Sequence, residues 1–305
     1  MRWKPIRLIP DDTKYPFMRL SRFGFFVSGI LCAASIAIFV LVGLNYGIDF
    51  KGGTVMTVRT TGAAEIDKLR TELNGLGLGG VELQQFGGPS DVLIRLAAQG
   101  DDKLEQAAQA KVKAALGPTI EVRSTETVGP KVSQELTQQA IAAVMLSLLF
   151  VLIYLWVRFE WQFAVGAILS LLHDVTLSIG LFCIIGLEFN LSIIAAILTI
   201  IGYSLNDTVV VFDRIREFLR KFKSMPLADL IDHSINSVLP RTILTSLATM
   251  MALIALYVFG GEVIRGFTFA MIWGVVVGTY SSIFIASPVL ILLGTKREMP
   301  GAEKV

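Results

Sequence analysis

The sequence predicts an α-helical membrane protein with six transmembrane helices and one small α+β domain between the first and second of them. Hydrophobic residues make up 53% of the 305 residues and charged residues only 17%. Soluble proteins have about 25% charged residues, so this composition excludes an ordinary soluble enzyme. Residues 49–133, however, hold ten of the 27 basic and eleven of the 25 acidic side chains. This stretch therefore has the charge density of a soluble domain.

Six apolar runs approach or exceed the roughly 20 residues that a helix needs to cross the hydrocarbon core. They cover residues 23–44, 140–157, 163–187, 189–212, 243–259 and 267–293. The third and fourth runs are separated only by Glu188 and its neighbours, which predicts a tight hairpin. The first run is too long for a signal peptide, and no small-residue cleavage site follows it. We therefore expect it to stay in the protein as an anchor.

Lys and Arg are unevenly distributed between the predicted connections. Six precede the first run and five follow the fourth, at Arg2, Lys4, Arg7, Lys14, Arg19, Arg22, Arg214, Arg216, Arg220, Lys221 and Lys223. The connection around Glu262 carries only Arg265. Since basic loops tend to stay in the cytoplasm, both termini, Met1 and Val305, are expected there. Residues 45–138 are expected on the outer, periplasm-like side.

The expected organisation follows from these runs. It consists of a cytoplasmic segment (1–22), the first span (23–44), the outer domain with linkers (45–138), spans two to six (139–295) and a cytoplasmic tail (296–305). A cytoplasmic amphipathic loop is expected at about 213–241. Within it, residues 223–240 predict either a helix lying in the membrane interface or a short helix packed against the bundle. The pattern favours neither.

The outer stretch alternates helical and strand patterns. Strands are expected at 54–59, 81–86, 92–96 and 120–122, and helices at 63–76 and 101–117. The order β-α-β-β-α-β is the ferredoxin-like split motif. Residues 128–132, which include Gly129 and Pro130, are expected to form the linker back to the membrane.

Two acidic residues fall inside predicted spans, Asp174 in the third and Asp207 in the fourth. A charge at the centre of a membrane helix costs about 2.5–3.5 kcal/mol on insertion scales, and such residues usually mark ion or proton pathways. The alternative is a neutral, hydrogen-bonded acid that only fixes helix packing. The polar neighbours that would support the acids are His173, Ser204, Asn206 and Thr208. This polar run favours function for Asp207, while both hypotheses stay open for Asp174 and its histidine.

Arg241 opens the fifth run, directly after Pro240. An arginine at the membrane edge is often only a topology anchor. The competing hypothesis pairs it with Asp207, whose charged form it would stabilise while burial opposes that form. The sequence leaves both open. In the last run, Gly274 and Gly278 form a small-xxx-small pattern, which predicts close helix packing.

No cofactor-binding, nucleophile or zinc-helix motif is present. The two cysteines, Cys32 and Cys183, lie inside apolar runs, so neither a disulfide framework nor a CxxC-type metal site is expected. The formal net charge of +2 argues against a nucleic-acid partner. We therefore expect no cofactor, no metal and no enzymatic activity.

Several stretches closely resemble the bacterial SecF family of protein-export membrane proteins, in the resistance-nodulation-division (RND) superfamily. They are residues 47–54, with Asp49, Lys51, Gly52 and Gly53, and residues 128–130, 156–163, 173–174, 202–208, 213–217 and 241–246. The resemblance covers nearly the whole chain, in order. It departs at Pro240, where relatives commonly have a small polar residue, and this departure questions only the local helix start.

The resemblance implies that the six spans are half of an RND-type bundle that an obligate SecD partner completes. It further implies association with the SecYEG channel and YajC in the lipid of the bacterial inner membrane. Protons driven by the proton motive force would then promote the movement of translocating polypeptide substrates. Residue by residue, Asp207 and Arg241 match the family's proton-pathway acid and arginine. Asp174 matches a motif that the family shares.

Two rival hypotheses are a half-size exporter of small molecules or lipids and an intramembrane aspartyl protease. The fold alone does not separate exporters from one another, but about 85 outer residues are few for a substrate path. A protease would need two carboxylates close enough to share one proton. Asp174 and Asp207 are on adjacent predicted spans, but the glycine-flanked aspartate motif of such proteases is missing.

Overall fold

The computed structural model describes residues 10, 13–85, 87–118 and 120–295 of the chain. They form two compact units. The helical unit contains the chain up to Leu44, Leu146–Leu187 and the chain from Ser192, and the α+β unit contains Asn45–Met145 and Glu188–Leu191. The expected tail 296–305, including Val305, lies outside the described residues, as do Met1, the rest of 1–9, residues 11–12 and Phe86.

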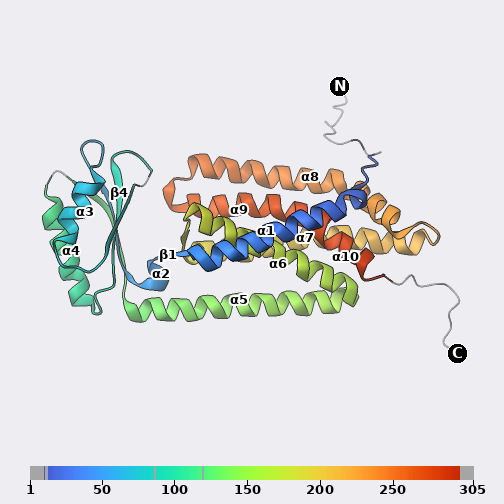
Figure 1. The fold of residues 1–305 in the computed structure, drawn as a ribbon, viewed down its shortest axis with the longest axis horizontal. Helices are drawn as coiled ribbons and strands as arrows, with labels where there is room; N and C mark the ends of the chain where they lie inside the picture. The colour runs from blue at the N-terminus through green and yellow to red at the C-terminus, as the bar shows by residue number, and fades with distance from the viewer. Residues whose placement is uncertain (1–9, 11–12, 86, 119, 296–305) are drawn as a thin grey trace, which may run out of the picture. The chain divides into compact units, whose positions relative to one another are not determined.

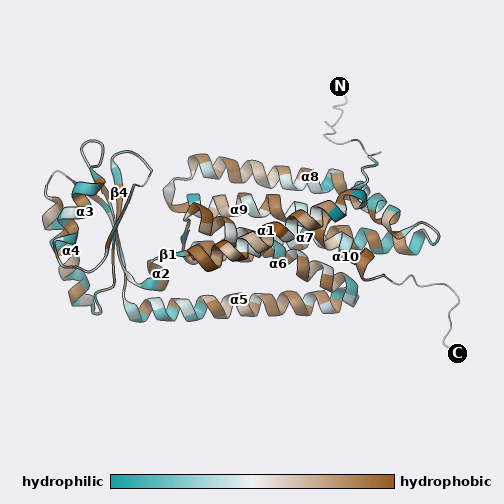
Figure 2. Ribbon diagram, viewed as in Figure 1, coloured by the Kyte–Doolittle hydropathy of each residue, from teal (hydrophilic) through white to brown (hydrophobic). Residues whose placement is uncertain are grey.

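Six helical segments in the described part of the chain are long and apolar enough to cross a membrane, which confirms the expected number of spans. They are α1 (Phe17–Val42), α5 (Pro130–Arg158), α6 (Trp161–Ile185), α7 (Leu191–Lys221), α8 (Leu227–Phe259) and a last segment of α9 (Glu262–Ser281), the π-helix η1 (Ser282–Ala286) and α10 (Ser287–Leu292), as Figure 1 shows. Figure 2 shows apolar residues along most of their lengths. Among the six, α6 and the last segment are the most buried.

Two connections differ from expectation. The linker expected at 128–132 is wrong, because the strand before it reaches Val128 and α5 begins at Pro130. Proline suits the first helical position, where its missing N–H is not needed, so Pro130 begins a helix rather than a loop. The loop expected at about 213–241 is also wrong, since only residues 222–226 separate α7 from α8.

Residues 227–240 are the first part of α8, which continues through Pro240 without interruption. Leu230, Ile231 and Ile235 are at most 1% exposed. These side chains are buried inside the protein. This agrees with the hypothesis of a helix packed against the bundle rather than one lying in the membrane interface. Arg241 therefore lies inside α8 rather than at its start.

The α+β unit contains the expected ferredoxin-like domain. Its elements are β2 (Gly53–Arg59), α3 (Ile66–Asn74), β3 (Val81–Gln85), β4 (Asp91–Leu96), α4 (Asp102–Leu116) and β5 (Glu121–Val128). The antiparallel sheet has the order β3-β4-β2-β5, and Figure 1 shows α3 and α4 on one face of it. Met56, Val58 and Ile94 are fully buried in the core between sheet and helices.

Three short elements were not predicted: β1 (Asn45–Tyr46), α2 (Ile48–Lys51) and β6 (Glu188–Phe189). β1 pairs with β6 in parallel, with Asn45 opposite Glu188 and Tyr46 opposite Phe189. Strands of two residues are too short to show a period. The connection between α6 and α7, expected as a simple hairpin, is therefore joined to the segment that follows α1.

Candidate functional site

α7 places Asp207 inside the helical unit, where the residue is only 8% exposed. Its Oδ1 accepts a hydrogen bond of 2.9 Å from the Thr242 hydroxyl of α8. Its Oδ2 accepts one of 2.8 Å from the Ser282 hydroxyl of η1. Both hydrogen-bond partners in the described residues are thus neutral hydroxyls, which can donate or accept a hydrogen bond.

α6 places Asp174 in a second buried group. Oδ1 lies 2.9 Å from Nδ1 of His173, and Oδ2 accepts hydrogen bonds from Ser204 at 2.5 Å and from Ser281 at 2.8 Å. The hydroxyl of Ser170 donates to that of Ser281 at 2.9 Å. Each of these five residues is at most 6% exposed. Asp174 therefore has a complete local set of partners.

Consecutive residues of the last segment serve the two acids. Ser281 donates to Asp174, while Ser282 donates to Asp207. Successive side chains of a helix point about 100° apart, so one helix can serve acids on two neighbouring helices. The π-helix η1 begins at Ser282, and π-turns inside helices occur frequently at functional sites.

The hypothesis that Arg241 and Asp207 form a direct pair is not supported by the geometry. Arg241 is exposed, and no ion pair joins it to Asp207 in the part of the chain that the structure describes. The next residue, Thr242, makes the contact instead. The sequence order Arg-Thr concealed this, because adjacent helical residues face different directions.

The expected supporting residues divide into two groups. His173 and Ser204 contact Asp174, and Thr208 is buried, whereas Asn206 is exposed. Sequence reasoning missed four hydroxyl residues that complete the site, namely Ser170, Thr242, Ser281 and Ser282. Thr242 lies in the stretch 241–246 that resembles the family, but the only signal of the three serines was a polar side chain in an apolar span. Ser and Thr occur widely in such spans, where their hydroxyls bond the backbone.

The glycine pattern of α9 produces the close packing that it predicted. A Cβ at Gly274 would lie 2.2 Å from Cγ1 of Ile200, and one at Gly278 would lie 3.0 Å from Cβ of Ser204. α9 thus approaches α7 too closely for a larger side chain at Gly274.

The motif residues Asp49, Lys51, Gly52 and Gly53 belong to the α+β unit. Gly52 has φ 70° and Gly53 φ 110°, a region that glycine adopts far more readily than other residues. A Cβ at Gly53 would also lie 2.2 Å from the carbonyl oxygen of Leu96. The carboxylate of Asp49 accepts a 2.9 Å hydrogen bond from the backbone N–H of Leu191, the first residue of α7.

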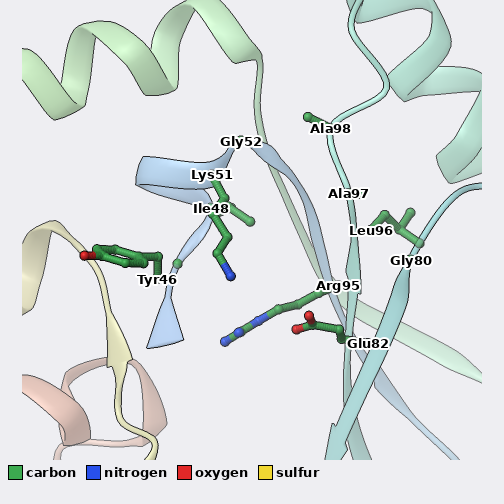
Figure 3. A pocket seen from close by; sticks show the side chains of 11 residues that line it. Tyr46, Ile48, Lys51, Gly52, Gly80, Glu82, Arg95, Leu96, Ala97 and Ala98 are labelled. Atoms are coloured by element: carbon green, nitrogen blue, oxygen red, sulfur yellow. The ribbon is translucent and has the colours of Figure 1, made fainter. Parts of the chain in front are cut away.

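A cavity of about 200 Å³ lies beside this motif. It is lined by Tyr46, Gly47, Ile48, Lys51, Gly52, Gly80, Glu82, Arg95, Leu96, Ala97 and Ala98. Figure 3 shows Lys51 and Arg95 pointing into the same space, with Glu82 beside Arg95. The cavity wall thus mixes both charges. Among the described residues, no group of three or more His, Cys, Asp or Glu side chains could hold a metal ion.

Comparison with known proteins identifies relatives along nearly the whole chain. Residues 108–296 match the family described as protein export membrane protein SecD/SecF, C-terminal, and residues 36–64 match the SecD/SecF GG motif. A protein translocase subunit SecF from Rhodobacter capsulatus is 42% identical, over 96% of this chain and 92% of its own length. A protein translocase subunit SecDF from Brucella abortus is 44% identical, over 98% of this chain but 40% of its own.

A solved structure has the same fold. The crystal structure of SecDF from Thermus thermophilus, described as a translocon-associated membrane protein, matches with a TM-score of 0.85 at 36% identity. The match covers 95% of this chain and 40% of that one. A structure of SecDF in a super-membrane-facing form matches with a TM-score of 0.70 at 37% identity.

Six apolar helices around two buried acids, with one ferredoxin-like domain between the first two spans, define a multi-pass membrane transport component. The chain belongs to the SecD/SecF family of protein-export membrane proteins, since the family match covers most of it and full-length relatives exceed 40% identity. The expected family and fold class are confirmed.

Proposed function

We propose that the chain is the SecF-type subunit of a protein translocase and that Asp207 carries the proton whose movement assists polypeptide translocation. The observation that carries this proposal is the burial of Asp207 against two hydroxyls, with no cation paired to it among the residues that the structure describes. A carboxyl without a fixed counter-ion has no ion pair to break when it takes up a proton. Buried acids in membrane helices are characteristic of proton relays.

The two serines can serve both protonation states of the acids. Ser282 Oγ lies 2.8 Å from Asp207 Oδ2 and 3.0 Å from the Thr279 carbonyl oxygen, but a hydroxyl has only one hydrogen. It can donate to a charged Asp207, or turn to Thr279 and accept from a protonated one. Ser281 has the same choice between Asp174 and the Gly278 carbonyl oxygen. We therefore include Asp174 in the pathway.

Proton movement supplies enough free energy to shift a conformational equilibrium. One charge crossing 100 mV gains about 2.3 kcal/mol, and one pH unit adds about 1.4 kcal/mol. Together these bias two conformations several hundredfold, on the scale of about 1.4 kcal/mol for each factor of ten. Arg241 contributes a fixed positive charge near the pathway.

The proposal includes a partner and a location. SecD is the proposed partner, because the SecDF relatives contain the matching region within one longer chain. Association with the SecYEG channel is supported by the description of the solved SecDF as translocon-associated, and YajC by the sequence resemblance alone. The positive-inside distribution supports an orientation with residues 45–138 in the periplasm and both termini in the cytoplasm. The bacterial inner membrane is proposed from the sequence resemblance.

Asp207→Asn tests the proton role. The amide keeps the size and an accepting oxygen but does not titrate, so we expect normal assembly with SecD and loss of the proton-dependent stimulation of secretion. Asp207→Glu should keep partial activity, and Arg241→Lys should keep most of the stimulation, because lysine retains the positive charge and the described residues that bond Asp207 are Thr242 and Ser282. The measurement is precursor translocation into inverted vesicles with and without an uncoupler, at matched protein levels.

The packing hypothesis predicts the opposite order, with Asn tolerated and Glu damaging. Uncoupler-sensitive stimulation of wild-type size in the Asn variant would eliminate Asp207 as the proton carrier. Thr199→Val is the matched control, because Thr199 is an exposed hydroxyl residue of the same helix whose hydroxyl, within the described part of the chain, bonds only the Ala195 carbonyl oxygen. Its stimulation should equal that of the wild type.

The rival functions fit the geometry less well. An aspartyl protease needs carboxylates that share a proton, but each acid has its own hydroxyl partners, and no hydrogen bond joins them in the described residues. A half-size exporter would move a small molecule without any precursor protein. Proton uptake that depends on a precursor therefore separates translocase from exporter.

A further inference from the structure

The connection between α6 and α7 belongs to the α+β unit. Residues 188–191 cluster with the domain that follows α1, whereas the helices on either side belong to the helical unit. These helices carry Asp174 and Asp207. Residues 188–191, the last of which is the first residue of α7, are thus the part of this connection that belongs to the α+β unit.

Three kinds of contact hold this connection. β1 and β6 pair in parallel, and the N–H of Gly47 extends the pairing with a 2.9 Å hydrogen bond to Phe189 O. The rings of Tyr46, Phe50 and Phe189 pack against one another, with ring centroids 5.9–6.3 Å apart. A Cβ at Gly47 would lie 2.7 Å from a carboxylate oxygen of Glu188, so a larger residue there would displace the Glu188 side chain.

Asp49 holds the start of α7. The first N–H groups of a helix have no partner within the helix, and the carboxylate of Asp49 accepts from the N–H of Leu191 at 2.9 Å. A negative charge at this end also interacts favourably with the helix dipole. Asp49 therefore acts as a helix cap supplied from a distant part of the sequence.

Arg95 connects the same place to the sheet. It lies on β4, forms an ion pair with Glu188, and donates a 3.2 Å hydrogen bond to Asn45. The side chains of Arg95 and Glu188 are 13% and 29% exposed, so water screens the pair only in part. A central strand of the domain is thereby bonded to the residues that begin α7.

α7 is a single continuous helix that can transmit a displacement along its length. It runs without proline from Leu191 through Asp207, and sharp helix kinks usually need a proline or a similar defect. Sixteen residues of helix span about 24 Å. A displacement of α7 at Asp207 is therefore expected to move Leu191 by a similar distance.

We propose that Asp49 and the Arg95–Glu188 pair are positioning residues that couple the movement of α7 to the α+β domain. This inference rests on the proposed proton role of Asp207 and adds the mechanical connection to it. Protonation changes at Asp207 displace α7, and the cap at Leu191 and the ion pair at Glu188 pass the displacement to β4.

The test separates proton movement from its mechanical output. The full complex with SecD is reconstituted in vesicles, and proton uptake (by a pH-sensitive dye) and precursor translocation are measured on one preparation. Asp49→Ala should keep wild-type proton uptake but lower the proton-dependent stimulation by about fivefold, the size expected for losing a helix cap. Asp49→Asn should restore it, since asparagine caps helices about as well as aspartate.

Variants of the Arg95–Glu188 ion pair test the same coupling independently. Arg95→Glu should lower stimulation while proton uptake stays, and the double variant Arg95→Glu with Glu188→Arg should recover it, because the charges attract again. The matched control is Asp67→Ala, which removes an exposed first-turn aspartate of α3 whose side chain, among the described residues, bonds only Arg70 of the same helix. It should leave both quantities unchanged.

The coupling role is overturned if Asp49→Ala shows the wild-type level of proton-dependent translocation. It is also overturned if Asp49→Ala lowers that translocation and Asp49→Asn does not restore it. Parallel loss of proton uptake and stimulation in Asp49→Ala also overturns it, since the residue then acts on the pathway. Failure of the proposed function looks different. In that case Asp207→Asn itself retains proton uptake and stimulation, whatever the Asp49 variants do.

Discussion

Ser281 and Ser282 are neighbours in the chain, yet their hydroxyls bond different buried acids on different helices. Ser281 reaches Asp174 of α6, and Ser282 reaches Asp207 of α7. A rotation of the last segment about its own axis would move both hydroxyls together. The hydrogen bonds of the two acids are therefore geometrically linked, although the acids themselves are not bonded to each other.

Ser282→Ala should lower proton-dependent stimulation more than Ser281→Ala, because only Ser282 contacts the proposed carrier. A hydrogen bond to a charged group contributes about 1.5–3 kcal/mol, which corresponds to roughly tenfold or more. Ser282→Thr keeps a hydroxyl and should retain activity. Translocation into inverted vesicles measures the series, and equal effects of both alanine variants would contradict the assignment.

Gly274→Ala should destabilise the helical unit by about 1–3 kcal/mol, the usual cost of overpacking. A Cβ at Gly274 meets Ile200 at 2.2 Å, whereas one at Gly202 of α7 meets nothing within 4 Å. Gly202→Ala is thus the control and should be neutral or slightly stabilising. Thermal unfolding of the purified complex in detergent compares the two, and equal melting temperatures would refute the packing role.

Residues 53–128 should fold when expressed alone. They contain all four strands of the sheet order β3-β4-β2-β5 and the buried core beneath it. A fragment ending at Thr125 should be less stable, because Thr127 and Val128 pair with β2. Circular dichroism should show a cooperative melt for the longer fragment, and a random-coil spectrum would show that folding needs the rest of the chain.

The isolated domain should lose stability in acid partly through Asp91. Two hydrogen bonds from Arg59, of 2.6 and 2.7 Å, hold the pKa of Asp91 below its usual value of 3.8. A group with a lowered folded-state pKa stabilises the fold above its unfolded pKa, and this stability is lost as the pH falls through the folded pKa. Asp91→Asn should therefore show a smaller loss of unfolding free energy between about pH 5 and pH 2. Identical acid profiles for wild type and variant would contradict this.

Single cysteines test the orientation. In a background without Cys32 and Cys183, a cysteine at Ser90 should react with a membrane-impermeant thiol reagent on intact spheroplasts, and one at Ser224 should not. The expected pattern follows from the basic residues near residues 222–226. Reaction at Ser224 but not at Ser90 would reverse the proposed orientation.

The sequence predicted the elements that have a strong period or composition. Six spans and the β-α-β-β-α-β order were correct, because apolar runs and alternating strands are local signals. Helix ends were less accurate: α8 continues through Pro240 and α5 begins at Pro130. Apolar composition marks where a helix crosses a membrane, not where the helix itself begins.

The site was only half predictable. Asp174 and Asp207 were found because an acid in an apolar span is costly. Ser281, Ser282 and Thr242 were not, because a hydroxyl in a membrane helix costs little and is common. The cap from Asp49 to Leu191 joins residues 142 positions apart, and no local pattern reveals such a contact.

Only Gly129 separates the last residue of β5 from the first residue of α5. The direction in which the side chains of α5 point is therefore fixed by the end of β5. Each residue added between them would rotate the helix by about 100° about its own axis. An insertion here would present another stripe of α5 to its surroundings, while three or four added residues would nearly restore the original stripe. Length variation among functional variants of this junction should therefore be periodic rather than gradual.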